Sequence, residues 1–241
     1  MRKTIGILGG MGPLATADLF RKIVLLTDAG SDNEHIRIYV DNNIRIPDRT
    51  AAILSGGRDP VPEMAAALRN LEACGADCIV MPCNTAHYFL PELRTMTQTP
   101  ILSMLDITAE VCAKTRPGKR AGVLATRGTL ATGLYNQALS AQGVDCLLPD
   151  EPGRDLLMAA IYDGVKKGVP LTPMRDGLVS LVEDMTNQGA GYFVLACTEL
   201  PIVREVLDLP GDFVDPTTEL AKAAIRFCGY PLRESGVVKE Q

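Results

Sequence analysis

The fold is decided by a nine-residue stretch that occurs twice, as GADCIVMPC at residues 75–83 and as GAGYFVLAC at residues 189–197. The two copies align without gaps at an offset of 114 residues. Each copy passes from a glycine through a short apolar run to a cysteine, Cys83 or Cys197. Two further matches at nearly the same offset pair residues 5–8 with 121–124 and residues 105–110 with 214–219. We interpret the repetition as a duplication that produces two similar α/β domains facing each other.

Short β-like runs alternate with stretches of helical periodicity along the chain, which is typical of parallel sheets with right-handed crossovers. Strands are expected at residues 4–8, 36–40, 78–81, 100–103, 120–125, 145–148 and 192–196. Helices are expected at residues 14–26, 61–73, 88–96, 104–113, after 126, and at 156–167, 174–188 and 220–227. These elements predict two pseudo-symmetric domains, each a mainly parallel sheet flanked by helices, with the active site in the interdomain cleft.

The domain boundary is expected near Arg116-Pro117-Gly118. It divides the chain into an N-terminal α/β domain of residues 1–116 and a C-terminal α/β domain of residues 117–241. The division leaves room for the last helix to pack back on the first domain.

Composition indicates a globular protein and argues against several classes of partner. The chain has 241 residues, of which 46% are hydrophobic, with a net charge of −5. That balance excludes a disordered chain and argues against nucleic acid or an anionic membrane as the partner. No apolar run approaches the roughly 18 residues that span a bilayer. Seven cysteines without regular spacing favour a reducing compartment, hence the cytoplasm, and most of them are expected to be buried apolar residues.

The two repeated cysteines suggest a particular chemistry. Ligands of open α/β sheets bind at the carboxyl ends of the strands, where both cysteines lie. The polar residues that follow them, Asn84-Thr85 and Thr198-Glu199, suit a carboxylate. Two such ends facing each other would place a thiol on each side of one carbon, as racemisation requires. A thiol, ordinarily of pKa about 8.5, can serve as acid or base once its surroundings lower that pKa, and helix dipoles behind both cysteines are expected to do so.

At this point the motifs resemble a known family. The first turn, GGMGP at residues 9–13, the PCNTAH motif at residues 82–87 and Cys197-Thr198-Glu199 are similar to the aspartate/glutamate racemase family, in its aspartate racemase branch. The resemblance covers nearly the whole chain. It implies a pseudo-symmetric two-domain fold, a two-base mechanism, and neither pyridoxal phosphate nor a metal nor any other cofactor. It also implies a homodimer.

The resemblance assigns roles to individual residues. Cys83 and Cys197 match the two catalytic cysteines, and Arg49 and Lys166 match cations that hold a substrate carboxylate. Without the resemblance, Arg49 reads as an exposed surface residue and Lys166 as a solvated helix end. Glu199 stands where glutamate racemases of the cell-wall pathway have a histidine. The expected substrate-binding residues are Met11, Arg49, Asn84, Thr85, Thr126, Lys166, Thr198 and Glu199.

Three other interpretations of these motifs are weaker. The glycine-rich first turn differs from the G-x-G-x-x-G pattern, and the acidic partner of a dinucleotide site is missing. Cys74, Cys78 and Cys83 could form a zinc site with His87, but core packing explains the first two better. A Cys83–His87 hydrolase pair would leave Cys197 unexplained.

The sequence therefore predicts racemisation of an acidic amino acid, with aspartate first and glutamate or both as the alternative. One methylene is worth only about 1–3 kcal/mol of discrimination, so the sequence does not choose between the two substrates. Superfamily relatives such as hydantoin racemase or maleate isomerase form a second alternative. A non-catalytic dicarboxylate-binding protein forms a third.

Overall fold

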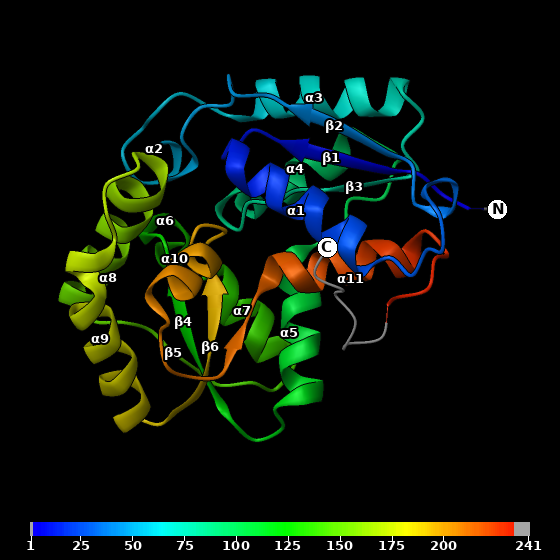
Figure 1. Cartoon of the computed structure of the whole chain (residues 1–241). Coiled ribbons are helices and arrows are strands. Elements are labelled where there is room, and N and C mark those ends of the chain that lie inside the picture. Colours follow the sequence, from blue (N-terminus) through cyan, green and yellow to red (C-terminus); the bar gives the residue numbers. More distant parts are fainter. Residues whose placement is uncertain (1, 234–241) are drawn as a thin grey trace.

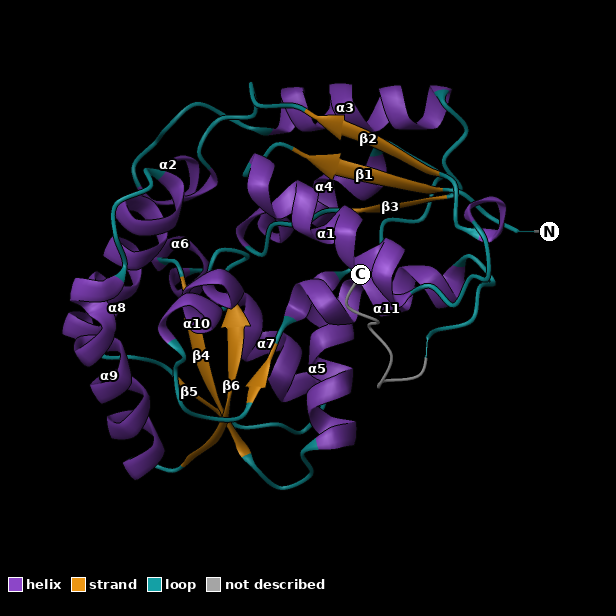
Figure 2. Ribbon diagram, in the orientation of Figure 1, coloured by secondary structure: helices purple, strands orange, loops and turns teal. Residues whose placement is uncertain are grey.

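A computed structural model describes residues 2–233, which form two parallel sheets flanked by helices (Figures 1 and 2). Residue 1 and residues 234–241, at the outer ends of the two expected domains, lie outside the described residues. The first sheet has the order β2-β1-β3 and the second the order β5-β4-β6-β7. The α/β class is therefore confirmed. The strands are β1 (Ile5–Gly9), β2 (Ile38–Asn42), β3 (Cys78–Val80), β4 (Arg120–Ala125), β5 (Cys146–Leu147), β6 (Ala190–Ala196) and β7 (Phe213–Val214).

The two sheets repeat each other strand by strand. β1 lies between β2 and β3 as β4 lies between β5 and β6, and every pairing is parallel. β7 extends the second sheet beside β6. At the matching place in the first sheet, the strand expected at residues 100–103 is reduced to a single bridge between Ile79 and Ile101. The duplication inferred from the sequence is thus visible as a repeated strand order.

Helices connect the strands, as the periodicity predicts, with several differences in their boundaries. Two short helices, α2 and α10, were not expected. The helix expected at residues 88–96 is preceded by a 3₁₀ turn, and the stretch expected at 156–167 begins earlier and continues as a π-helix. The first half contains α1 (Pro13–Leu26), α2 (Arg49–Leu54), α3 (Val61–Ala73), α4 (Leu90–Thr95) and α5 (Met104–Thr115), with the 3₁₀ turns η1 (Asp32–Glu34) and η2 (Thr85–Phe89). The second half contains α6 (Arg127–Ala131), α7 (Leu134–Ala141), α8 (Glu151–Met158), α9 (Arg175–Asn187), α10 (Leu200–Leu207) and α11 (Pro216–Phe227), with the π-helix η3 (Ala159–Lys166) and the 3₁₀ turn η4 (Thr172–Met174).

Side-chain caps explain several of these helix starts. Asp48 accepts a hydrogen bond from the Ala51 N–H and so begins α2. Thr126 accepts one from the Thr129 N–H and begins α6. The last helix begins at Pro216 rather than at residue 220, because Asp215 caps it and proline is preorganised for the first helical position.

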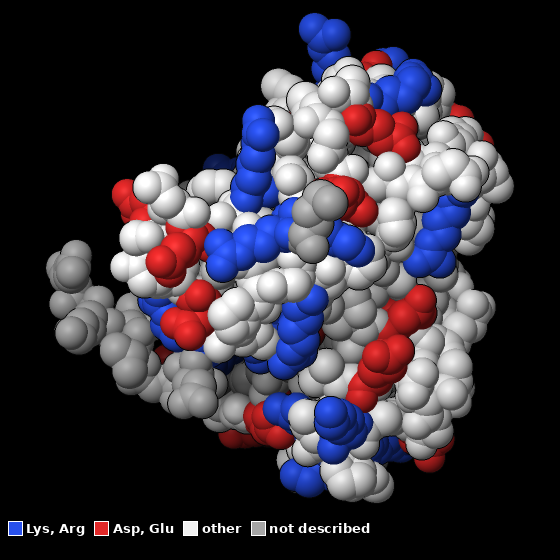
Figure 3. Space-filling view, turned by 90° about the vertical axis from the view of Figure 1, so that its right-hand side faces the viewer, with Lys and Arg blue, Asp and Glu red and all other residues white. Residues whose placement is uncertain are grey.

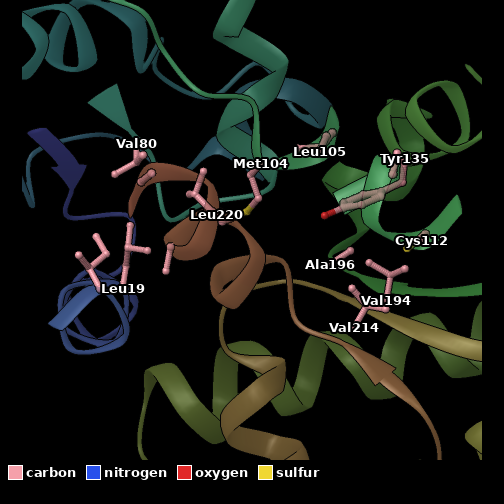
Figure 4. Packing of buried hydrophobic residues seen from close by; sticks show 14 of the residues in the cluster. Leu19, Val80, Met104, Leu105, Cys112, Tyr135, Val194, Ala196, Val214 and Leu220 are labelled. Carbon is pink, nitrogen blue, oxygen red and sulfur yellow. The ribbon is translucent and has the colours of Figure 1, made fainter. Parts of the chain in front are cut away.

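Successive side chains of each strand point into two different cores, because parallel sheets are buried on both faces. Ile7 and Val80 of the first sheet and Val194 and Ala196 of the second belong to one continuous central core. Figure 4 shows Met104 and Leu220 between the two sheets in this core. The opposite faces pack into separate outer cores, which contain Cys83 in the first half and Cys197 in the second.

Two helices link the halves. α5 belongs to the first half in sequence but contacts α7 of the second, whereas α11 of the second half contacts α1 of the first. α5 and α11 also contact each other (Figure 1). The connection is therefore more than a simple linker, and the boundary near residue 116 stays a prediction.

Within residues 2–233, no helix is both long and apolar enough to cross a membrane. On the face drawn in Figure 3, basic and acidic side chains are interspersed rather than segregated. A mixed surface of this kind, with a net charge of −5, does not favour binding to a polyanion.

Candidate active site

A small, nearly filled pocket lies where the carboxyl ends of the two sheets meet. In Figure 1 the arrowheads of β1 and β2 point toward α2, and that of β6 points toward α10. Every site residue expected from the sequence lines this pocket, together with three that were missed, Asp48, Thr50 and Tyr162. Asp48 and Thr50 flank Arg49 directly, and Tyr162 precedes Lys166 by four residues, a spacing that shares one helix face. The lining residues are Met11, Asp48, Arg49, Thr50, Cys83, Asn84, Thr85, Thr126, Tyr162, Lys166, Cys197, Thr198 and Glu199.

The glycine-rich turn after β1 shapes one wall. Gly10 has φ +92°, and a Cβ there would lie 2.3 Å from the carbonyl oxygen of Asn43, so only glycine fits. Thr16 ties the turn down, because its hydroxyl accepts from the Gly10 N–H and donates to the Gly12 carbonyl. This turn places the buried Met11 against the pocket, with its carbonyl available to Arg49.

Arg49 is a fixed cation, not the exposed residue that its type suggests. Only 7% of it is exposed. Its Nη1 donates to the Pro47 carbonyl at 2.9 Å and its Nη2 to the Met11 carbonyl at 3.0 Å, whereas its Nε has no hydrogen-bond partner among the described residues. Burial lowers the pKa of Arg49, but the charges of Cys83 and Asp48 outweigh that effect and leave the pKa above its ordinary value. The guanidinium is therefore a permanent positive charge beside Cys83.

Asn84 holds a second donor at the same end of the pocket. The hydroxyl of Tyr135, on α7 of the other half, donates to Asn84 Oδ1 at 2.6 Å. Asn84 Nδ2 is buried and has no partner among residues 2–233. A buried donor without a partner is costly. Asn84 Nδ2 and Arg49 Nε are two such donors on residues that line one pocket, and oxygen atoms of a bound anion could satisfy both.

His87 supports the turn after Cys83 from behind and does not line the pocket. The Met104 N–H donates to His87 Nε2 at 3.0 Å, so the ring proton is on Nδ1, which donates to the Cys83 carbonyl at 2.9 Å. Burial lowers the pKa of His87 from 6.5 to about 4. The histidine is therefore neutral and contacts a carbonyl rather than the sulfur, unlike the base of a Cys-His hydrolase.

Cys197 lies in a different electrostatic setting. Its Sγ donates to Glu199 Oε2 at 3.0 Å, and the Thr198 hydroxyl donates to the same oxygen at 3.2 Å. Burial and the carboxylate of Glu199 raise the pKa of the Cys197 thiol well above its ordinary value, and Lys166 offsets only part of this. The expectation that the surroundings lower the pKa of both thiols is thus wrong for Cys197. The reason is that burial, and after it the carboxylate of Glu199 next to the sulfur, raises the pKa of this thiol.

Lys166 and Tyr162 close the side of the pocket next to Glu199. Both lie on the π-helix η3, a helix type often found at functional sites. Lys166 Nζ is 3.8 Å from Glu199 Oε1 and 4.3 Å from the centroid of the Tyr162 ring. Burial lowers the pKa of Lys166, but the combined effect of its neighbours, chiefly Glu199 and Cys197, outweighs burial and leaves the pKa above its ordinary value. The ammonium therefore stays charged. The Tyr162 hydroxyl donates to Asp48 Oδ2 at 3.0 Å and thereby joins the two halves.

A cluster of hydroxyls joins the halves on the opposite side. Thr85, from the turn after β3, hydrogen-bonds to Thr126 at 3.1 Å and to Thr129 at 2.8 Å. Next to them α2 and α6 approach so closely that a Cβ on Gly128 would lie 2.8 Å from the hydroxyl of Thr50. These contacts join the carboxyl ends of the two sheets.

The zinc alternative has no support in the geometry. Cys74 is exposed, whereas Cys78 is buried with its sulfur 3.8 Å from that of Cys228. No three histidine, cysteine, aspartate or glutamate side chains within residues 2–233 converge on a point where they could hold a metal ion.

Comparison with known proteins agrees with this geometry. Residues 8–224 match the model of the family described as Asp/Glu/Hydantoin racemase. The chain is 28% identical to the broad specificity amino-acid racemase RacX of Bacillus subtilis over 236 residues, which cover 92% of this chain and 96% of that protein. The aspartate racemase of Picrophilus torridus superposes with a TM-score of 0.83 and 31% identity, covering 96% of both chains. Glutamate racemase of Francisella tularensis, solved with D-glutamate, has a TM-score of 0.65 over 94% of this chain and 81% of that one, and its 16% identity shows a shared fold alone.

Proposed function

Because the chain belongs to the Asp/Glu/hydantoin racemase family and is an amino-acid racemase, we propose that it racemises an acidic amino acid, aspartate first, with Cys83 and Cys197 as the two bases. The observation that carries the proposal is the placement of two cysteines from repeated strand ends, Cys83 after β3 and Cys197 after β6, in the wall of one pocket. Racemisation needs a base on one face of the α-carbon and an acid on the other.

In the proposed reaction one cysteine acts as a thiolate and the other as a thiol. The thiolate takes the α-proton, so the C–H bond breaks and its electron pair moves toward the substrate carboxylate. The opposite thiol then gives its proton to the other face of the carbon and becomes a thiolate. The reaction is complete without a cofactor, because each cysteine ends with the proton state that the other had at the start.

The pocket offers donors for the charge that develops. Arg49 Nε and Asn84 Nδ2 have no hydrogen-bond partner among residues 2–233, and both belong to residues beside Cys83, so they could hold carboxylate oxygens. Lys166 supplies a second cation near Cys197. Two cations suit a substrate with two carboxylates, and a guanidinium is the better partner for a planar carboxylate. This arrangement supports an acidic amino acid over a neutral one.

The proposal is tested by mixing the protein with L-aspartate in D₂O, without added cofactor, and following the α-proton by NMR and the optical rotation. We expect the α-proton signal to disappear as the rotation falls to zero. L-Glutamate and L-alanine serve as comparisons, with glutamate slower and alanine inert. Binding of aspartate without exchange would show a dicarboxylate-binding protein instead, and exchange only with hydantoins would point to the other branch of the family.

Two accompanying expectations concern the cell. All seven cysteines are free in the structure, which agrees with a reducing compartment. Placement in the cytoplasm and assembly as a homodimer stay predictions, to be checked by cell fractionation and by sedimentation of the purified protein.

A further inference from the structure

We propose that Glu199 is a positioning residue that keeps Cys197 protonated in the resting enzyme, so that Cys83 is the cysteine that starts as the base. The inference rests on the proposed two-cysteine function and adds a fixed order of roles to it. It begins from one place where the duplicated halves differ.

The internal repeat identifies the difference. At the offset of 114 residues that superposes the two cysteines, Asn84 matches Thr198 and Thr85 matches Glu199. The backbone is repeated, but a neutral hydroxyl in the first half is replaced by a carboxyl group in the second. Thr85 turns to Thr126 and Thr129, whereas Glu199 accepts the hydrogen bond from Cys197.

The surroundings of the two sulfurs are opposite in charge. Cys83 lies next to the buried guanidinium of Arg49, a positive charge. Cys197 donates to Glu199 Oε2 at 3.0 Å, and a thiolate there would place two anions in contact within a buried site. Other groups that act on Cys197 are Lys166, at 3.8 Å from the far oxygen of Glu199, Tyr135 of α7, and the backbone N–H of Glu199, which lowers the pKa of the thiol by less than its carboxylate and burial raise it.

Lys166 does not cancel the effect of Glu199. Its ammonium is shared between Glu199 Oε1 and the face of the Tyr162 ring, on the side of the carboxylate that is away from the Cys197 bond. Both the burial of Cys197 and the adjacent carboxylate keep its proton in place. The resting enzyme therefore holds Cys197 as a thiol, which leaves Cys83 as the cysteine that can begin as the base.

The arrangement has a consequence for each catalytic cycle. Once Cys83 has taken a proton from the substrate and Cys197 has given one to it, Cys83 is a thiol and Cys197 is a thiolate beside Glu199. This form of the enzyme is the less stable of the two. The starting form returns when a substrate of the opposite hand reacts, or when solvent protonates Cys197 and takes the proton of Cys83. The two enantiomers thus meet enzyme forms of unequal population.

Alkylation of the free enzyme tests the inference without relying on turnover. The protein is treated briefly with iodoacetamide at pH 7, and the modified cysteines are quantified by mass spectrometry, with the exposed Cys74 as an internal standard. Only the thiolate reacts. We expect Cys83 to react at least about tenfold faster than Cys197, because one pKa unit changes the thiolate population tenfold. Glu199→Gln should raise the rate at Cys197 by about tenfold or more.

Two further variants separate charge from shape. Glu199→Asp retains a carboxylate and should keep Cys197 slow, whereas Glu205→Gln, the same change on the exposed face of α10, should alter neither cysteine. Equal reactivity of Cys83 and Cys197 in the unmodified protein would overturn the inference, and so would a Glu199→Gln variant in which Cys197 stays slow. If the alkylation pattern holds while no acidic amino acid exchanges its α-proton, the proposed function fails and the protonation order stands.

Discussion

The strand ends that carry Cys83 and Cys197 have the same backbone setting and opposite electrostatics. Each cysteine follows a buried parallel strand, Cys83 after β3, which pairs with β1, and Cys197 after β6, which pairs with β4. One sulfur lies beside a buried arginine, and the other donates a hydrogen bond to a buried glutamate.

The difference shows which part of a duplication is free to vary. Strand position depends on the apolar pattern and on hydrogen bonds along the whole sheet, so it cannot change without unfolding the half. The charge next to a sulfur depends on one side chain in a turn. A pair of equivalent cysteines can therefore acquire unequal roles through a single residue such as Glu199.

The largest effects should follow from removing either sulfur. Cys83→Ser and Cys197→Ser should each lower the rate of racemisation at least about 10³-fold, roughly 4 kcal/mol, because a serine hydroxyl is a far weaker acid than a thiol and does not ionise near neutral pH to serve as the base. The comparison predicts that the two variants keep unequal residual rates of α-proton exchange. Cys197→Ser keeps Cys83, the proposed first base, and should still exchange the α-proton of one enantiomer, whereas Cys83→Ser should exchange neither at a comparable rate.

Following the α-proton of L-aspartate and of D-aspartate separately by NMR in D₂O measures these residual exchange rates. Cys74→Ser, a change at an exposed cysteine, is the control and should leave racemisation unchanged. Equal residual exchange in the two cysteine variants would show that the two ends are equivalent after all.

Arg49→Lys tests whether the guanidinium beside Cys83 binds a substrate carboxylate. We expect kcat/KM to fall by about 10²–10³-fold, roughly 3–4 kcal/mol, because an ammonium cannot serve the Pro47 and Met11 carbonyls and also offer a planar donor to a carboxylate. Arg45→Lys, on an exposed position four residues earlier, is the matched control. An Arg49→Lys enzyme with an unchanged kcat/KM would remove Arg49 from the site.

The first half should also be the more sensitive to acid. His87 stands behind Cys83, whereas Pro201 occupies the corresponding position behind Cys197. Burial lowers the pKa of His87 to about 4 in the folded chain. As the pH falls below 6.5 the unfolded chain binds this proton first, so the free energy of unfolding should drop by about 3 kcal/mol between pH 6.5 and pH 4.

Urea unfolding at pH 7, 5.5 and 4 measures this dependence. His87→Gln should be less stable than the unmodified protein at pH 7, because it loses a buried hydrogen bond, but should show a shallower decline toward pH 4. His35→Gln changes the chain's other histidine and should retain the full decline. Identical slopes in the unmodified protein and His87→Gln would contradict the assignment.

The smallest effect concerns the hydrogen bond between Tyr162 and Asp48, which joins the two halves across the pocket. Tyr162→Phe removes the hydrogen bond to Asp48 across the pocket and should cost about 1 kcal/mol, seen as a KM raised about fivefold with kcat little changed. Tyr88→Phe, at a largely exposed ring, is the control. A fall in kcat with constant KM would instead give Tyr162 a part in the proton transfers.

Much of the architecture could be predicted from local patterns. The strand at residues 120–125 and the helix at 61–73 have the bounds that their sequences indicate, since both have clear periodicity and definite ends. The helices α2 and α10 escaped prediction because six and eight residues are too few for a periodic pattern. The strand expected at residues 100–103 is reduced to one bridge, because pairing depends on a neighbouring strand and not on local propensity.

The site was predicted unevenly for a related reason. The cysteine pair and the polar residues after it follow from the internal repeat. Asp48, Thr50 and Tyr162 did not stand out, because nothing in their neighbourhood distinguishes them from ordinary surface residues. Their place in the pocket depends on how α2 and η3 meet across the two halves.

By itself, the sequence determined that the chain is duplicated, that its sheets are parallel and that a cysteine ends an equivalent strand in each half. These are matters of order and periodicity, which linear spacing records. Only the tertiary structure decided that Arg49 is buried beside one sulfur and that Glu199 accepts a hydrogen bond from the other. The reason is that burial removes the water that would otherwise screen these charges, so a neighbour in sequence becomes a strong influence on a thiol only after folding.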